Sequence, residues 1–315
     1  IKELNKNKFW IWTLRYLLHQ EAGRGEDRLL FDFQVSISKK IFPEIKNNNA
    51  SAEKLMHRYF RSALSISEIN STVMQSFKEK ISTPRKVLPK FLDKNFQVRG
   101  NLIELRDPKR LSNNPSLILE IFVKLCENPK IDGIHSNTLR SLKDNRGLID
   151  SEFRRKKKNI DYFMKLIKSE RLMVTQLEKM KQLGILGRYL PEFGKVTGKM
   201  QYDLFHIYTV DAHTLQVLRN MRRLFLGTSK NIYPLASEIV HQLPKLEVLY
   251  ISGLYHDIGK GRDTDHSNFG AKTVRRFCKN HRLNKKDSEL IQWLVENHLI
   301  MSITSQKQDL TNPIV

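Results

Sequence analysis

The sequence predicts a mainly helical protein with one small β-hairpin. Apolar residues recur at intervals of three and four through most of the 315-residue chain, the spacing that gathers them on one face of a helix. Only around residues 96–106 does the apolar period change to two, on either side of Gly100 and Asn101. A period of two indicates strands, and a short Gly-containing turn between two such runs indicates a hairpin.

The first half of the chain is predicted to form core helices joined by polar turns. Two glycines among the charged residues 21–28 favour a turn after the first helix. Residues 46–50 are expected to form a polar loop, with Ser51 as a possible helix N-cap. Helical spacing returns after Pro108 and ends near Pro129. The helices expected before the hairpin lie at residues 10–20, 31–41 and 51–77.

The second half is predicted to be helical apart from a turn-rich segment at residues 183–194, which contains three glycines and a proline. Gly133 and Gly147 interrupt the pattern before it, so we expect a domain boundary near residue 146. This divides the chain into a helical domain at residues 1–145 and a second domain at residues 146–315. Further helices are expected at 160–167, around His213, before His256, and around Phe277 and Trp293.

The composition is that of a globular protein, with 40% hydrophobic and 28% charged residues. No apolar run is long enough to cross a bilayer, and the first residues contain neither Met nor the hydrophobic region of a signal peptide. The two cysteines, Cys126 and Cys278, cannot form a disulfide framework. We therefore expect a cytoplasmic protein with no membrane partner.

The chain is strongly basic, with a formal net charge of +22. Lysine and arginine can neutralise nucleic-acid phosphates, but here they are spread along the sequence rather than gathered. The one dense run, Arg154 to Lys158, is interpreted first as a solvated helix end, second as a surface for an acidic protein and third as a nucleic-acid contact. Nucleic acid is accordingly not the expected partner.

Histidines and a carboxylate cluster in the last third of the chain. An apolar run leads to His256 and Asp257, so this pair is expected at the buried end of a helix. Taken alone, the pair could simply cap that helix before Gly259. Five of the ten histidines, however, lie in motif-like settings between residues 206 and 298. Imidazole and carboxylate ligands together suit Mn²⁺, Mg²⁺, iron or Zn²⁺, and the clustering favours a metal site.

The motifs in this region resemble a known family. His213, the pair His256–Asp257 and a later Asp resemble the pattern of the HD superfamily, which consists of all-helical metal-dependent phosphohydrolases. Within it, the chain looks like the bacterial bifunctional uridylyltransferase/uridylyl-removing enzymes. The segments that carry this likeness are residues 203–214, 256–262 and 297–302, and it extends through residues 24–32, 114–122 and 184–193.

The resemblance implies an HD phosphohydrolase domain preceded by the helical domain that follows a nucleotidyltransferase domain in this family. It also implies the reaction, in which the uridylyl-tyrosine phosphodiester on the nitrogen-regulatory protein PII is hydrolysed and UMP is released. The expected cofactor is a divalent metal, with Mg²⁺ or Mn²⁺ ahead of iron or Zn²⁺. Such a metal acidifies bound water and polarises the phosphoryl group.

Individual roles follow from the same resemblance. His213, His256, Asp257 and Asp309 are expected to hold one metal ion. His266 and His298 are expected to bind a second ion or to contact the scissile phosphate, and Lys260 to pair with phosphate oxygens. His206 is the alternative to His213 as a metal ligand. It is expected instead to contact one of the ligands without binding the metal itself, or to pack in the core. The metal ligands are assigned by their match to the family motifs, and Lys260 because it is a compact cation in a loop flanked by glycines.

The chain also departs from the family pattern. Nothing before Arg24 supplies the Gly-Ser element and paired carboxylates of a nucleotidyltransferase, and the glutamine-sensing ACT domains expected after the HD domain are missing. We therefore expect no transferase activity and no glutamine control. Two alternatives stay open: a non-catalytic helical module that binds protein, and an HD phosphohydrolase acting on free nucleotides. Metal content separates the first from the leading hypothesis, and substrate screening separates the second.

Overall fold

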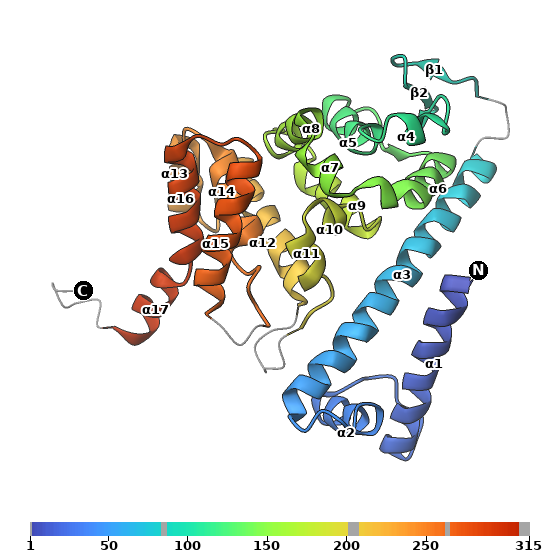
Figure 1. The fold of residues 1–315 in the computed structure, drawn as a ribbon, viewed down its shortest axis with the longest axis vertical. Coiled ribbons are helices and arrows are strands. Elements are labelled where there is room, and N and C mark those ends of the chain that lie inside the picture. The colour runs from blue at the N-terminus through green and yellow to red at the C-terminus, as the bar shows by residue number, and fades with distance from the viewer. Residues whose placement is uncertain (1, 83–86, 201–207, 262–264, 309–315) are drawn as a thin grey trace. The chain divides into compact units, whose positions relative to one another are not determined.

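The computed structural model describes residues 2–82, 87–200, 208–261 and 265–308, and confirms a mainly helical fold with one small sheet (Figure 1). It divides into two compact units, Ile1–Ala212 and His213–Val315. The domain boundary predicted near residue 146 stays a prediction. Within the described parts, no helix combines the length and the apolar character that crossing a membrane requires.

The first unit begins with three helices that share a core: α1 (Lys2–Ala22), α2 (Phe31–Ile41) and α3 (Asn48–Ser82). Trp10, Leu14 and Leu18 lie four residues apart on α1 and are buried against α2 and α3. Four-residue spacing places them on one face, so the predicted apolar pattern accounts for this packing. Figure 1 shows α1 running alongside α3.

The start of α3 differs from the prediction. The helix begins at Asn48, inside the expected polar loop, because the side chain of Asn47 accepts a hydrogen bond from the backbone N–H of Ala50 at 3.1 Å. Ser51, the expected N-cap, is instead a fully buried residue of the helix whose hydroxyl lies 2.8 Å from that of Ser38. Asparagine caps helices as well as serine does, which explains the shift.

The hairpin is confirmed and belongs to a sheet of four strands in the order β1-β2-β3-β4. β2 (Phe96–Arg99) pairs antiparallel with β3 (Leu102–Leu105), and Gly100 adopts a φ of +63° in the turn. β1 (Lys90–Phe91) adds to one edge, and β4 (Gly133–Ile134) pairs parallel with β3 on the other. Two-residue strands are too short to show an apolar period, so the sequence did not predict them.

Short helices complete the first unit around a core that includes Phe122, Phe163 and Tyr189. The helices are α4 (Arg110–Asn113), α5 (Leu117–Glu127), α6 (Ser136–Asn145), the 3-10 helix η1 (Arg146–Leu148), α7 (Ser151–Arg155), α8 (Lys157–Ile167), α9 (Met173–Gln182), α10 (Leu186–Tyr189) and α11 (Pro191–Val196). In the dense basic run, Lys156 between α7 and α8 and Lys157 and Lys158 at the start of α8 are exposed, as expected for a solvated helix end.

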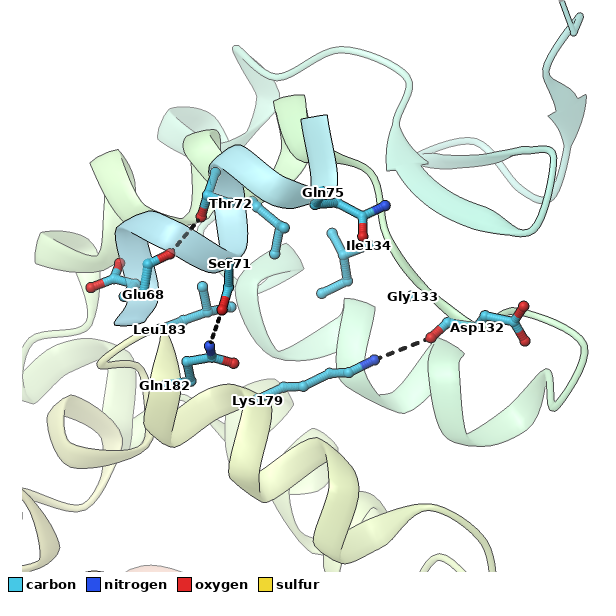
Figure 2. Close-up of a pocket in the computed structure, with 11 residues that line it drawn as sticks. Glu68, Ser71, Thr72, Gln75, Asp132, Gly133, Ile134, Lys179, Gln182 and Leu183 are labelled. Atoms are coloured by element: carbon cyan, nitrogen blue, oxygen red, sulfur yellow. Dashed lines mark hydrogen bonds between the residues drawn. The ribbon is translucent and has the colours of Figure 1, made fainter. Parts of the chain in front are cut away.

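One cavity of the first unit, of about 260 Å³, lies where α3 and α9 approach β4 (Figure 2). The side-chain amide of Gln182 donates to the Ser71 hydroxyl at 2.7 Å across it. The Lys179 ammonium donates to the backbone carbonyl of Asp132 at 3.3 Å, and burial lowers the pKa of this lysine. The carboxylate of Glu68 also lines this cavity, so its polar groups carry charges of both signs.

The described residues of the second unit form helices joined by turns, and the first of these helices begins in the last three residues of the first unit. Its helices are α12 (Val210–Phe225), α13 (Pro234–Gln242), α14 (Leu246–Tyr255), α15 (His266–Asn280), α16 (Lys285–Glu296) and α17 (Ile300–Lys307). α14 is apolar around its whole circumference and is buried from Tyr250 to Tyr255, with α15 and α16 packed against it. A helix that is hydrophobic on all sides belongs in a core. The end of α14 is therefore a buried position.

The stability of the second unit is expected to fall at acidic pH because of His281. Its ring stacks on Phe277 with centroids 3.8 Å apart, and burial lowers the pKa of His281 from 6.5 to about 4. The unfolded chain takes up a proton near pH 6.5, whereas the folded chain resists it until about pH 4. The free energy of unfolding should therefore decrease by about 2 kcal/mol between pH 7 and pH 5 through this group.

Urea unfolding at pH 7 and pH 5 measures this effect in the wild type and in His281→Asn. The asparagine cannot titrate but keeps an N–H that can replace the bond from Nδ1 of His281 to the Phe277 carbonyl, which is 3.0 Å long. The variant should lose less stability than the wild type on acidification. An equal loss in both proteins would contradict the prediction.

Candidate metal centre

The centre is built at the C-terminal end of α14. His256 is the residue that follows the helix, and Asp257 comes next with only 2% of its surface exposed. A helix C-terminus carries partial negative charge from its unpaired carbonyls, and the Asp257 carboxylate adds a full charge beside it. This end of α14 therefore favours a bound cation.

Three imidazoles surround the Asp257 carboxylate. The Nε2 atom of His256 lies 3.1 Å from its Oδ2, and the Nε2 atom of His213, on α12, lies 3.5 Å from the same oxygen. The Nε2 atom of His298, just after α16, lies 3.6 Å from Oδ1. The last two distances exceed a hydrogen bond, so these contacts are electrostatic. Residues from three helices thus converge on one carboxylate.

These side chains form two groups with the spacing of metal ligands. The ligand atoms of His213, His256 and Asp257 lie within 4.8 Å of one another, and so do those of Asp257, His266 and His298. Asp257 belongs to both groups. A carboxylate has two oxygens, so one residue can serve two neighbouring ions.

Backbone carbonyls fix the orientation of two of the histidines. The Nδ1–H of His256 donates to the carbonyl of Gly253, and the Nδ1–H of His298 donates to the carbonyl of Val295, each at 2.8 Å. A carbonyl can only accept, so both rings carry their proton on Nδ1 and leave the Nε2 lone pair for the centre. This outer hydrogen bond accompanies most metal-binding histidines.

The charges around Asp257 keep it ionised. Burial alone would raise the pKa of Asp257, but His256, His298 and Lys260 outweigh it and hold that pKa far below its usual range. The Lys260 ammonium lies 3.0 Å from Oδ2. Burial lowers the pKa of His266, which favours the neutral ring that binds metals, whereas the nearby Asp257 raises the pKa of His298 against the effect of burial.

The donor set fits a divalent cation. Among the described residues, the buried Nε2 atoms of His266 and His298 have no hydrogen-bond partner, a condition that proteins rarely leave uncompensated. A metal ion is the partner for which such atoms are suited. Neither Cys126 nor Cys278 belongs to the two groups, so the ligands are nitrogen and oxygen, as Mg²⁺, Mn²⁺, iron and Zn²⁺ accept.

Two local features place His266. The side chain of Asp265 caps α15 by accepting from the backbone N–H of Ser267 at 2.9 Å and of Asn268 at 3.4 Å, so His266 is the first residue of that helix. Gly259 packs against it so closely that a Cβ there would lie 2.4 Å from the His266 carbonyl oxygen. Only glycine permits this approach.

The structure brings together six of the residues singled out from the sequence: His213, His256, Asp257, Lys260, His266 and His298. Asp309 and His206 lie outside the described residues. The sequence did not predict that the carbonyls of Gly253 and Val295 orient two histidines, nor that Gly259 packs closely against His266. The carbonyls had a signal, because each lies three residues before a histidine at a helix end, where carbonyls lack helical partners.

Comparison with known proteins finds matches along nearly the whole chain. The HD domain family matches residues 210–314, the Uridylyltransferase GlnD third domain matches residues 96–189, and the GlnD PII-uridylyltransferase family matches residues 1–74. Among curated proteins, the bifunctional uridylyltransferase/uridylyl-removing enzyme of Pseudomonas aeruginosa (strain UCBPP-PA14) is 45% identical over 315 residues, which is 99% of this chain and 35% of that protein.

Two further relatives carry the same description. The protein of Azotobacter vinelandii (strain DJ / ATCC BAA-1303) is 46% identical over 315 residues, and that of Pseudomonas fluorescens (strain SBW25) is 44% identical over 313 residues. In both cases the match covers 99% of this chain and 35% of the relative. The chain therefore spans about a third of the length of the curated relatives that it matches.

Proposed function

Because this chain belongs to the family of bifunctional uridylyltransferase/uridylyl-removing enzymes and contains an HD domain, we propose that it hydrolyses the uridylyl-tyrosine phosphodiester of PII and releases UMP. The observation that supports this most directly is the position of Asp257. It is buried, ionised and shared by two groups of ligand atoms, and two of the histidines face it through oriented Nε2 atoms.

We assign His213, His256, Asp257 and Asp309 to one divalent ion, and His266 and His298 to a second ion or to the scissile phosphate. Mg²⁺ or Mn²⁺ is the favoured metal. When bound, it would acidify a water molecule and neutralise charge on the phosphoryl oxygens. Asp309 completes the set by analogy with the family pattern alone. PII as the protein partner and the cytoplasmic setting come from the family as well.

The chain's own residues would orient the ester. His266 and His298 sit on one side of Asp257, with ring centroids 5.4 Å apart, and can contact a phosphate oxygen from there. Lys260 pairs with Asp257 in this structure, and a metal ion that took over that carboxylate would free the ammonium for the phosphate. A compact cation at this point would stabilise the charge that develops on the phosphoryl oxygens.

Incubation of the chain with uridylylated PII and Mn²⁺ tests the proposal, with UMP release followed by chromatography. Free UMP-containing nucleotides and model phosphodiesters form a parallel arm. UMP release from PII that stops on chelation supports the proposal. Hydrolysis of free nucleotides but not of uridylylated PII would show that the chain is a nucleotide phosphohydrolase instead. Absence of any hydrolysis by protein with bound metal would overturn the proposal.

Replacement of Lys260 by Gln is expected to separate catalysis from metal binding. Because Lys260 competes with a cation for Asp257, the variant should bind Mn²⁺ at least as tightly as the wild type. Without the ammonium at the phosphate, UMP release should slow by about 100-fold. Calorimetric Mn²⁺ titration and the release assay measure the two effects.

The matched control is Lys285→Gln, which removes an exposed lysine of the same unit whose nearest partner is Glu289 at 3.8 Å. It should change neither quantity. A Lys260→Gln variant that hydrolyses at the wild-type rate would show that this lysine does not contact the ester.

A further inference from the structure

A second cavity of the first unit, about 470 Å³ in volume, is lined by five cations. Arg61 reaches it from α3, Arg146 from η1, Lys181 from α9, Arg188 from α10 and Lys195 from α11. Among the described residues that line it there is no carboxylate and no aromatic ring. It differs in this respect from the cavity of Figure 2, where Glu68 and Asp132 accompany a single lysine.

Two of the five cations already have a counter-charge. Arg146 lies 3.3 Å from the buried carboxylate of Glu68, and Lys181 lies 2.8 Å from that of Asp211, which is fully buried. These pairs hold Arg146 and Lys181 in place. Within the parts of the chain that the structure describes, Arg61, Arg188 and Lys195 form no ion pair, and all three are exposed.

Three uncompensated positive charges around one cavity repel one another, and a bound anion would relieve that repulsion. A half-buried neighbour, His57, lies beside the same group of cations. The Nε2 atom of His57 lies 3.1 Å from the carbonyl oxygen of Thr197 at the cavity wall. Burial lowers the pKa of His57, and the charges of Arg61 and Lys199 add to this against the opposing effects of the Thr197 carbonyl and Asp211.

Glycines give the cavity its shape. A Cβ at Gly194 would lie 2.5 Å from the carbonyl oxygen of Gly187, so α10 and α11 can meet only because both residues lack side chains. Gly184 has a φ of +67°, and a Cβ there would lie 2.9 Å from the Nη1 atom of Arg146. The wall between α10 and α11 is therefore close-packed backbone, which sets the spacing of the two helices that carry Arg188 and Lys195.

We propose that this cavity binds the phosphate chain of a small polyphosphate anion, such as pyrophosphate or the triphosphate of a nucleotide. Its volume falls in the usual range for small-molecule sites and is larger than one phosphate group needs. Three unpaired cations on three helices match an anion with several charges. Without an aromatic ring in the lining there is no surface on which a base could stack, so recognition rests on the phosphates.

Isothermal titration of the full chain with pyrophosphate, UTP and UMP, at low ionic strength and with EDTA to remove metal ions, tests the proposal. Pyrophosphate and UTP should bind, and UMP should bind much more weakly. The triple variant Arg61→Gln, Arg188→Gln and Lys195→Gln should lose this binding, by roughly tenfold for each cation removed. The substituted residues are exposed, so the fold should be retained, which circular dichroism can verify.

The matched control removes three exposed cations from α15 instead: Lys272→Gln, Arg275→Gln and Arg276→Gln. It has the same net charge as the cavity variant and should bind pyrophosphate like the wild type. Equal weakening in both triple variants would assign the binding to net charge and overturn the proposal. Absence of pyrophosphate and UTP binding by the wild type would overturn it as well.

Discussion

Replacement of Asp257 by Asn is expected to abolish metal binding and to slow UMP release by more than 100-fold. Asp257 is the one carboxylate in the two ligand groups found among the described residues, and it belongs to both. Loss of a residue that only supports a ligand costs roughly 10-fold to 100-fold in metal affinity or activity, so loss of the shared ligand should exceed this. Elemental analysis of the purified variant and the PII assay measure the two outcomes.

The asparagine matches the size of the aspartate, so a change in metal content can be attributed to charge. Asp287→Asn serves as the matched control, because Asp287 pairs with Lys245 at 2.7 Å in the same unit and lies in neither ligand group. That variant should keep its metal. A metal-loaded Asp257→Asn protein would remove the basis for placing the ion at the end of α14.

The periodicity of the sequence predicted most of this fold because helices and strands each need a regular apolar face. The hairpin at β2 and β3 followed from the change of period around Gly100, and the buried end of α14 followed from the apolar run before His256. Strands β1 and β4 are too short to carry a period. The start of α3 depended on which of several polar residues caps it, a choice made by local geometry.

The metal centre was accessible from sequence only in part. His256 and Asp257 are adjacent and follow an apolar helix, whereas His213 and His298 lie 43 and 42 residues from His256 and were placed by family resemblance. The orientation of the rings rests on the Gly253 and Val295 carbonyls, which no side-chain pattern reveals. The assignments of roles within the centre, and of Asp309 as a ligand, stay predictions.

The cavity lined by five cations could not be predicted from the sequence at all. Its five cations come from separate helices, and Arg61 is more than 100 residues from Lys195 along the chain. In a chain of net charge +22 each of them looks like one more solvated side chain. Tertiary packing, including the backbone contact of Gly187 with Gly194 that joins α10 and α11, brings them around one cavity, and such packing leaves no local pattern in the sequence.

Replacement of Gly259 by Ala is expected to remove His266 from the metal centre while leaving the other ligand group in place. The added Cβ would lie 2.4 Å from the carbonyl oxygen of His266 and 2.8 Å from its Cα, far inside van der Waals contact with backbone atoms. The backbone around Gly259 or the start of α15 must therefore move. A displacement of about 1 Å in a reacting constellation costs on the order of 100-fold in rate.

The two ligand groups make the expected result specific. His213, His256 and Asp257 do not involve α15, so one ion should still bind, while sites that need His266 should weaken. Mn²⁺ stoichiometry and UMP release in Gly259→Ala should therefore match those of His266→Ala. Gly147→Ala is the control, since a Cβ at that residue meets no atom within 4 Å. If Gly259→Ala kept the wild-type stoichiometry and rate, the close packing of Gly259 against His266 would not be needed to position this histidine, which would contradict the prediction.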